Sequence, residues 1–126
     1  MSKKVILTQN APAAIGPYSQ GIAGNGTVYV SGQLPINPET GNFAGEDITS
    51  QAEQSLKNVQ AVLAEAGLSL ENVAKVTVFL KDMNDFAAMN EVYARYFKGD
   101  CPARSAVQVA ALPKDALVEI EAIALR

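Results

Sequence analysis

The feature that most constrains the fold is a pair of segments whose apolar residues recur at helical spacing. In the first segment the apolar face consists of Ala52, Leu56, Val59, Leu63 and Ala66. In the second segment the corresponding stripe is Phe86, Met89, Tyr93 and Phe97. A helix that is apolar along one face must cover that face with another element. We therefore expect two amphipathic helices packed on a common partner.

The ends of both helices can be predicted from capping residues. The first helix is expected to begin within residues 47–50, where Ser50 and Glu53 have the spacing of a capping box. Gly67 is expected to end it in the left-handed conformation. The second helix is expected to begin near residue 84 or 85 and to end at Gly99.

The partner of the helices is expected to be a sheet. Segments that are short and rich in β-branched or aromatic residues are expected as strands: residues 4–8, 18–23, 27–31, 73–80, 103–110 and 117–125. Gly24-Asn25-Gly26 is a turn signal that closes a hairpin. The resulting order is β-β-β-α-β-α-β-β. It predicts one α+β domain over residues 1–126, with a mixed sheet and both helices on one face.

Alternation divides the strand residues between the two faces of this sheet. The residues expected beneath the helices are Val76, Val78, Leu80, Ser105, Val107, Val109, Val118, Ile120, Ala122 and Ala124. Those expected on the other face are Lys75, Thr77, Phe79, Arg104, Ala106, Gln108, Glu119, Glu121, Ile123 and Leu125. Because the second face mixes large apolar and charged side chains, we expect it to contact another subunit. The alternative is an ordinary solvent-exposed face.

The composition argues against several classes of site. The 126 residues are 18% charged with a net charge of −3, which argues weakly against nucleic acid as the main partner. There is no histidine, so a zinc site or a histidine base is not expected. Cys101 is the single cysteine and fits a reducing compartment. No apolar run is long enough for a signal peptide or a membrane span, so we expect a cytoplasmic protein.

Two charged strand residues are the leading candidates for chemistry. Arg104 begins a strand of small and apolar residues, and its guanidinium fork suits a carboxylate. Glu119 lies in a nearly apolar strand, where desolvation would raise the pKa of the carboxyl and suit it to proton transfer. The alternative for both is a structural salt bridge, and Glu121 competes with Glu119. We expect Arg104 and Glu119 to come from neighbouring strands and to face one cavity where chains meet.

Further candidates lie outside these strands. The Tyr18 hydroxyl could donate to a substrate, with simple packing as the alternative. Ser31 and Gly32 end a strand, and the backbone at Gly32 could approach a ligand closely, with a plain turn as the alternative. Asn90 falls on the apolar stripe of the second helix and needs a partner, so it either braces a loop or lines a pocket. Cys101 has no histidine to activate it.

Four long segments resemble sequences of the RidA/YjgF family, in the order in which that family has them. The segments are APAAIGPYSQG (residues 11–21), VSGQLPINPETG (30–41), TVFLKDMNDFAAMNEVY (77–93) and CPARSAVQVAALPKDALVEIEAIAL (101–125). The resemblance covers almost the whole chain. It implies a fold like that of chorismate mutase, in which three subunits form a barrel with three sites in the clefts between neighbours.

The resemblance also implies an activity, that of a 2-iminobutanoate/2-iminopropanoate deaminase. Water would attack imines derived from 2-aminoacrylate and 2-aminocrotonate, giving 2-oxo acids and ammonia, with no cofactor and no metal. Arg104 would bind the substrate carboxylate, and Glu119 would hold and orient the water. The residues that would line the pocket, from one subunit or its neighbour, are Tyr18, Ser31, Gly32, Asn90 and Ala106. Many relatives carry cysteine at the position of Ala106, so no thiol role carries over.

Three other functions stay open at this point. The first is a non-catalytic trimer that binds 2-oxo acids through Arg104. The second is a ribonuclease or translation inhibitor, which the acidic composition and the absence of histidine weaken. The third is a purely structural or chaperone-like protein. The sequence does not specify the preferred imine side chain, the dehydratase partner or any regulation.

Overall fold

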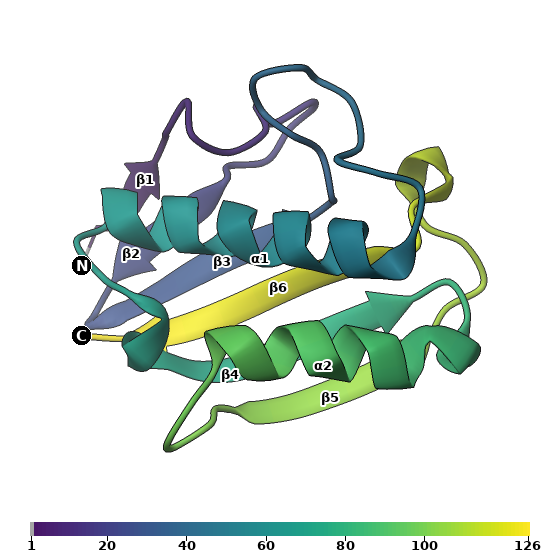
Figure 1. The fold of residues 1–126 in the computed structure, drawn as a ribbon. Coiled ribbons are helices and arrows are strands. Elements are labelled where there is room, and N and C mark those ends of the chain that lie inside the picture. Colours follow the sequence, from purple (N-terminus) through teal and green to yellow (C-terminus); the bar gives the residue numbers. More distant parts are fainter. Residues whose placement is uncertain (1) are drawn as a thin grey trace.

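The computed structural model describes residues 2–126 and consists of a six-stranded sheet with two helices packed on it (Figure 1). The strands are β1 (Lys4–Ile6), β2 (Gly21–Gly24), β3 (Thr27–Gln33), β4 (Val73–Leu80), β5 (Ala103–Gln108) and β6 (Val118–Leu125). The helices are α1 (Ile48–Glu65) and α2 (Phe86–Tyr96). The predicted order of helices and strands is confirmed. Within residues 2–126, neither helix is long and apolar enough to cross a membrane.

The strands lie in the order β1-β2-β3-β6-β4-β5. The β4–β5 pair is parallel and the other pairs are antiparallel, so the sheet is mixed as predicted. The predicted hairpin is formed by β2 and β3, where Asn25 and Gly26 both have positive φ. A tight turn of this kind matches the twist of the strands it joins. The strand expected over residues 18–23 begins only at Gly21, because the residues before it belong to a long loop.

The first helix begins one turn earlier than a cap at Ser50 would allow. Asp47 is the N-cap, and its side chain accepts a hydrogen bond from the backbone N–H of Ser50. The predicted Ser50–Glu53 capping box is therefore wrong. The extra turn places Ile48 in the core, which favours the earlier start. Gly67 follows the helix with φ of 78°, the left-handed conformation that was predicted.

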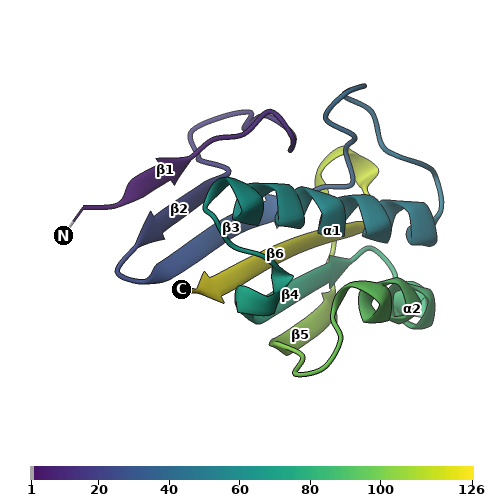
Figure 2. The same cartoon turned by 60° about the vertical axis from the view of Figure 1, so that its left-hand side comes forward.

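The core lies between the helices and one face of the sheet. Its strand residues are all buried and comprise Ile6, Ala23, Val28, Val30, Val73, Val76, Val78, Leu80, Val118, Ile120, Ala122 and Ala124. The predicted faces of β4 and β6 are thereby confirmed. Figures 1 and 2 show α1 and α2 side by side on the same side of the sheet, which is the predicted arrangement.

The predicted faces of β5 are wrong. In the parallel β4–β5 pair, Val76 is beside Arg104 and Val78 is beside Ala106. Because Val76 and Val78 are buried beneath the helices, Arg104 and Ala106 also face the helices, whereas Val107 lies on the opposite face and is 44% exposed. The strand lies at the edge of the sheet, where the helices cover it only partly, so large apolar residues do not mark its inner side.

The opposite face of the sheet carries no helix within residues 2–126 (Figure 2). Large apolar side chains are exposed there on several strands, including Tyr29 on β3 and Leu125 on β6, each about half exposed. Ile123 is paired with Tyr29 across the β3–β6 ladder, lies two residues before Leu125 on the same face, and is partly buried. We call this surface the open face.

Candidate functional site

Arg104 is held by one face of α2. Its Nη1 donates a hydrogen bond to Asn90 Oδ1 at 2.7 Å. Its guanidinium carbon lies 4.6 Å from the centroid of the Tyr93 ring and 5.5 Å from that of the Phe86 ring. Residues 86, 90 and 93 share a face because they are four and three positions apart. We call Arg104 and these three α2 residues the Arg104 half-site.

This arrangement leaves the positive charge of Arg104 available to bind an anionic ligand. No ion pair of Arg104 is found within residues 2–126. The aromatic faces stabilise the cation without neutralising it, and the Asn90 amide occupies one of its five donors. A partly buried, oriented guanidinium with free N–H groups can bind a carboxylate through two parallel hydrogen bonds.

Asn90 thus braces Arg104, a strand residue, rather than a loop, and the prediction that it lines a pocket stays a prediction. Phe86 and Tyr93 were counted only as core residues, and their contact with Arg104 was not predicted. Burial raises the pKa of Tyr93 to about 12, partly opposed by Arg104, so its phenol stays neutral beneath the guanidinium. Its buried hydroxyl has no hydrogen-bond partner within the described residues. The signal that could have indicated the contact is an asparagine flanked by aromatic residues at helical spacing.

Glu119 lies on the open face, against β3. A Cβ atom built on Gly32 would come within 1.9 Å of Glu119 Oε2, so the carboxyl occupies the space that a side chain at position 32 would need. Burial, and then the charge of Glu121, raise the pKa of the Glu119 carboxyl. The raised pKa agrees with the prediction for this residue. Its cause is desolvation between strands.

Ser31 precedes Gly32 and is bonded to the loop that joins β1 to β2, the loop that also carries Tyr18. Ser31 Oγ donates to the backbone carbonyl of Ser19 at 2.6 Å, and the Ser31 N–H donates to that of Gln20 at 3.0 Å. Tyr18 is 52% exposed, and its hydroxyl accepts a hydrogen bond from the Ile15 N–H at 3.4 Å. We call Tyr18, Ser31, Gly32 and Glu119 the Glu119 half-site.

The two half-sites are on opposite sides of the sheet. Arg104 faces α2, whereas Glu119 alternates with the buried Val118 and Ile120 and therefore faces away from the helices. The strands that carry Arg104 and Glu119 are not neighbours, because β4 lies between them. The expectation that the two side chains of one chain face a shared cavity is wrong, and so is the alternative of an Arg104–Glu119 salt bridge. The cause is the inverted face of β5.

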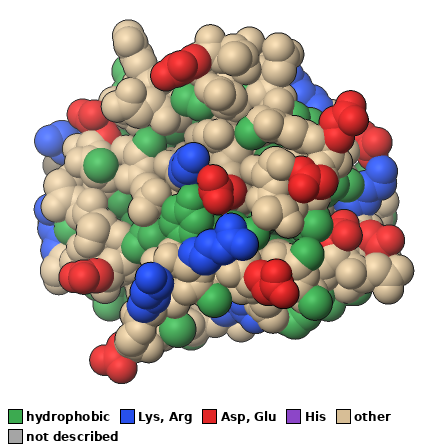
Figure 3. Space-filling model, in the orientation of Figure 1, with side chains coloured by type: hydrophobic (Ala, Val, Ile, Leu, Met, Phe, Trp, Pro, Cys, Tyr) green, Lys and Arg blue, Asp and Glu red, His purple; other side chains and the backbone are tan. Residues whose placement is uncertain are grey.

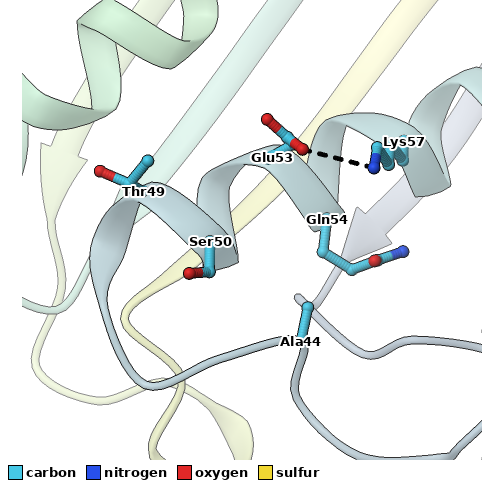
Figure 4. Close-up of a pocket in the computed structure, with 6 residues that line it drawn as sticks. All are labelled: Ala44, Thr49, Ser50, Glu53, Gln54 and Lys57. Carbon is cyan, nitrogen blue, oxygen red and sulfur yellow. Dashed lines mark ion pairs between the residues drawn. The ribbon is translucent and has the colours of Figure 1, made fainter.

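Two hollows on the surface of the single chain lie away from the half-sites. One is lined by Ala44, Thr49, Ser50, Glu53, Gln54 and Lys57, on the first turns of α1 (Figure 4). It is wide open and polar, and Glu53 and Lys57 form an exposed ion pair there at 3.3 Å. Neither hollow includes a residue of the half-sites. Substrate sites are concave and largely enclosed, whereas the hollow on α1 is open to solvent, so it does not have the form of a substrate site.

Charge on the helix-bearing face does not indicate a polyanion site. Figure 3 shows basic and acidic side chains interspersed over this face. Glu53 contacts both Lys57 of its own helix and Arg95 of α2, the latter at 3.9 Å. Residues 2–126 hold no group of three His, Cys, Asp or Glu side chains that could bind a metal ion.

Comparison with known proteins shows relatives over the whole length of the chain. The model of the family described as Endoribonuclease L-PSP matches residues 8–126. A RutC family protein of Pyrococcus horikoshii is 57% identical over 124 residues, covering 98% of both chains. The 2-iminobutanoate/2-iminopropanoate deaminase of Salmonella typhimurium is 53% identical over 126 residues, again covering 98% of both.

Solved structures give the same result for the fold. The crystal structure of E. coli TdcF with bound serine superposes with a TM-score of 0.94 at 52% identity, and the match covers 98% of each chain. The two structures therefore share the whole arrangement of helices and strands described above.

Proposed function

Because the chain belongs to the Endoribonuclease L-PSP family, also known as RidA/YjgF, we propose that it is a cytoplasmic deaminase of reactive 2-imino acids. The reaction is addition of water across the C=N bond of a 2-iminium carboxylate, followed by loss of the nitrogen. One iminium acid and one water give one 2-oxo acid and one ammonium ion. Its substrates are the imines derived from 2-aminoacrylate and 2-aminocrotonate.

The observation that carries this proposal is the oriented, unpaired guanidinium of Arg104. Its contacts with Asn90 and Tyr93 leave donors free for a planar carboxylate. A carboxylate is the group that all 2-imino acids share. The relative with bound serine, an amino acid that also carries a carboxylate, supports a ligand of this class.

We propose that the complete site forms between two subunits of a trimer. In one chain Arg104 and Glu119 face opposite sides of the sheet, so a site that uses both needs a second copy. The exposed apolar side chains of the open face, among them Tyr29 and Val107, support burial against such a copy. The Glu119 half-site of one subunit would then meet the Arg104 half-site of its neighbour.

Glu119 is proposed to hold the attacking water and to transfer a proton. Desolvation raises the pKa of its carboxyl, which makes it a better proton acceptor than a solvated carboxylate. The iminium carbon is already electrophilic, so orientation of substrate and water is the main contribution needed. The hydroxyl groups of Tyr18 and Ser31 and the backbone at Gly32 and Ala106 are proposed to line the same cleft.

The proposal is tested by generating the imine in situ with threonine dehydratase and measuring the release of ammonia and 2-oxobutanoate. We expect the protein to accelerate the release, and Arg104→Ala to lower the acceleration by about a hundredfold because substrate orientation is lost. Arg95→Ala is the matched control. Arg95 also lies on α2, but its side chain is exposed, and its one ion pair within residues 2–126 is with Glu53. An Arg104→Ala protein as fast as the unmodified one would refute the assignment.

The same assay separates the deaminase from a protein that only binds 2-oxo acids. Such a protein would bind 2-oxobutanoate in an Arg104-dependent way and would leave the rate of imine decay unchanged.

Cleavage of RNA is a second candidate because the matching family is described as an endoribonuclease. The chain has no histidine and a net charge of −3, which weakens this candidate. Incubation of purified protein with single-stranded RNA tests it. Cleavage that disappears in Arg104→Ala would favour a nuclease that uses the same residue.

A further inference from the structure

The loop between β1 and β2 (residues 7–20) is held by the side chain of one buried residue, Gln20. This side chain is 2% exposed. Its Oε1 accepts the Thr8 N–H at 2.8 Å, and its Nε2 donates to the carbonyls of Thr8, Ala11 and Pro12 at 3.0, 3.3 and 2.8 Å. All four partners are main-chain groups of the loop's first half. A buried amide with this many partners fixes a segment that has no regular hydrogen bonding of its own.

The backbone of the same residue fixes the other end of the loop. The Gln20 carbonyl accepts the N–H of Ser31, and the adjacent Ser19 carbonyl accepts the Ser31 hydroxyl. Gln20 therefore connects residues 8–12 to the end of β3, where the Glu119 half-site begins. Tyr18 lies within the segment closed in this way, two residues from Gln20.

Tyr18 has little else to hold it. Its ring is about half exposed, and its hydroxyl contact with the Ile15 N–H is long, at 3.4 Å. Its backbone N–H bonds to the carbonyl of Gly16, within the same turn. The position of Tyr18 relative to Ser31 and Glu119 is thus determined by the loop as a unit, and the loop is determined by Gln20.

We propose that Gln20 is a positioning residue of the active site, which acts by fixing the 7–20 loop so that Tyr18 is oriented toward the substrate cleft. This inference rests on the proposed deaminase function. Gln20 does not reach the substrate, because its side chain is buried and all of its hydrogen-bonding groups are used within the chain.

The first test measures the order of the loop without reference to activity. Hydrogen–deuterium exchange followed by mass spectrometry is compared for the unmodified protein, Gln20→Met and Asn58→Ala. Asn58 is a matched control, because its buried amide also donates to two carbonyls, those of Leu34 and Ile36 in another loop. We expect Gln20→Met to raise exchange at residues 8–18, including the Thr8 amide, and Asn58→Ala to leave that segment protected.

The second test asks whether Gln20 acts through Tyr18. In the coupled dehydratase assay, Gln20→Met should lower kcat/KM by about tenfold through misplacement of the loop. In a Tyr18→Ala background the same change should have little further effect, because no side chain is left to position. A purely structural residue would reduce kcat/KM equally in both backgrounds, since loss of folded protein does not depend on Tyr18.

The outcomes separate the inference from the function on which it rests. Unchanged exchange at residues 8–18 in Gln20→Met, or equal losses of kcat/KM in both backgrounds, would overturn the role of Gln20. An unmodified protein that fails to accelerate imine hydrolysis would refute the proposed function, and the exchange data would still decide whether Gln20 fixes the loop. If Gln20→Met does not fold, Gln20→Glu takes its place in both tests. This variant keeps the shape of the side chain and the acceptor for the Thr8 N–H, and it removes the amide donors.

Discussion

At the scale of single residues, position 32 has no room for a side chain, because the Glu119 carboxyl occupies that space. A methyl group at position 32 would overlap Glu119 Oε2, so the carboxyl must move before any side chain fits there. We predict that Gly32→Ala yields a folded protein whose kcat/KM for imine hydrolysis is about a hundredfold lower, because the water site is displaced.

A second glycine provides the control for this prediction. Gly24 ends β2, and a Cβ atom there would have 3.7 Å to its nearest neighbours, an ordinary contact. Gly24→Ala should therefore keep near-normal activity. Equal activity of both variants would show that the position of the Glu119 carboxyl does not matter for the reaction.

The raised pKa of the Glu119 carboxyl leads to a prediction about how the stability of the fold depends on pH. Because the carboxyl binds its proton more tightly in the folded protein, folding is favoured below the unfolded pKa, and this contribution is lost as the pH rises through the folded pKa. Glu119→Gln should remove that dependence. We predict that the variant is more stable than the unmodified protein at pH 7, and that the difference vanishes toward pH 4, in urea unfolding measured across this range. A difference that grows as the pH falls would contradict the assigned direction.

At the scale of helices and strands, the start of α1 depends on Asp47. The hydrogen bond from the Ser50 side chain is the main cause of the lowered pKa of Asp47; desolvation opposes it, and the Ser50 backbone N–H lowers the pKa further. A depressed folded pKa stabilises the protein above the unfolded pKa, and this stability is lost as the pH falls through the folded value. Asp47→Ala should therefore lower the midpoint of thermal unfolding at pH 7, and the effect should shrink toward pH 3.

The same experiment distinguishes the observed cap from the predicted one. In a Ser50–Glu53 capping box, loss of Glu53 would weaken the helix start as much as loss of the capping residue. In the structure Glu53 instead contacts Lys57 and Arg95 at the surface, and exposed pairs contribute about 0–1 kcal/mol. Glu53→Ala should lower the midpoint less than Asp47→Ala does.

The helices and most strands could be predicted from the sequence because a single pattern determines each of them. The stripe from Phe86 to Tyr93 and the alternation along β4 and β6 both follow from covering one face with apolar residues. Asp47 and Ser50, three positions apart, could not be ranked as the N-cap without knowing that Ile48 enters the core. The faces of β5 could not be predicted, because neither side of this edge strand is fully covered.

At the scale of the whole molecule, the sequence selects individual candidate residues but does not show their arrangement. Arg104 and Glu119 could be selected because charged groups in small or apolar strands are costly without a purpose. Whether the two share a side of the sheet depends on which face each strand turns toward the helices, and the local pattern of the edge strand β5 does not show this. The aromatic support of Arg104 depends likewise on the packing of α2 over β5.

We propose an active site in which Arg104 of one subunit and Glu119 of another act together. This proposal can be tested by unfolding Arg104→Ala and Glu119→Ala proteins together, refolding the mixture and assaying imine hydrolysis, with each variant refolded alone as the control. If sites form between subunits of a cyclic trimer, random assembly should restore about a quarter of the unmodified sites. About half of the subunits supply an intact Arg104 and about half an intact Glu119, and each site needs one of each from its two subunits. A mixture that forms mixed trimers and remains as inactive as either variant alone would contradict the claim.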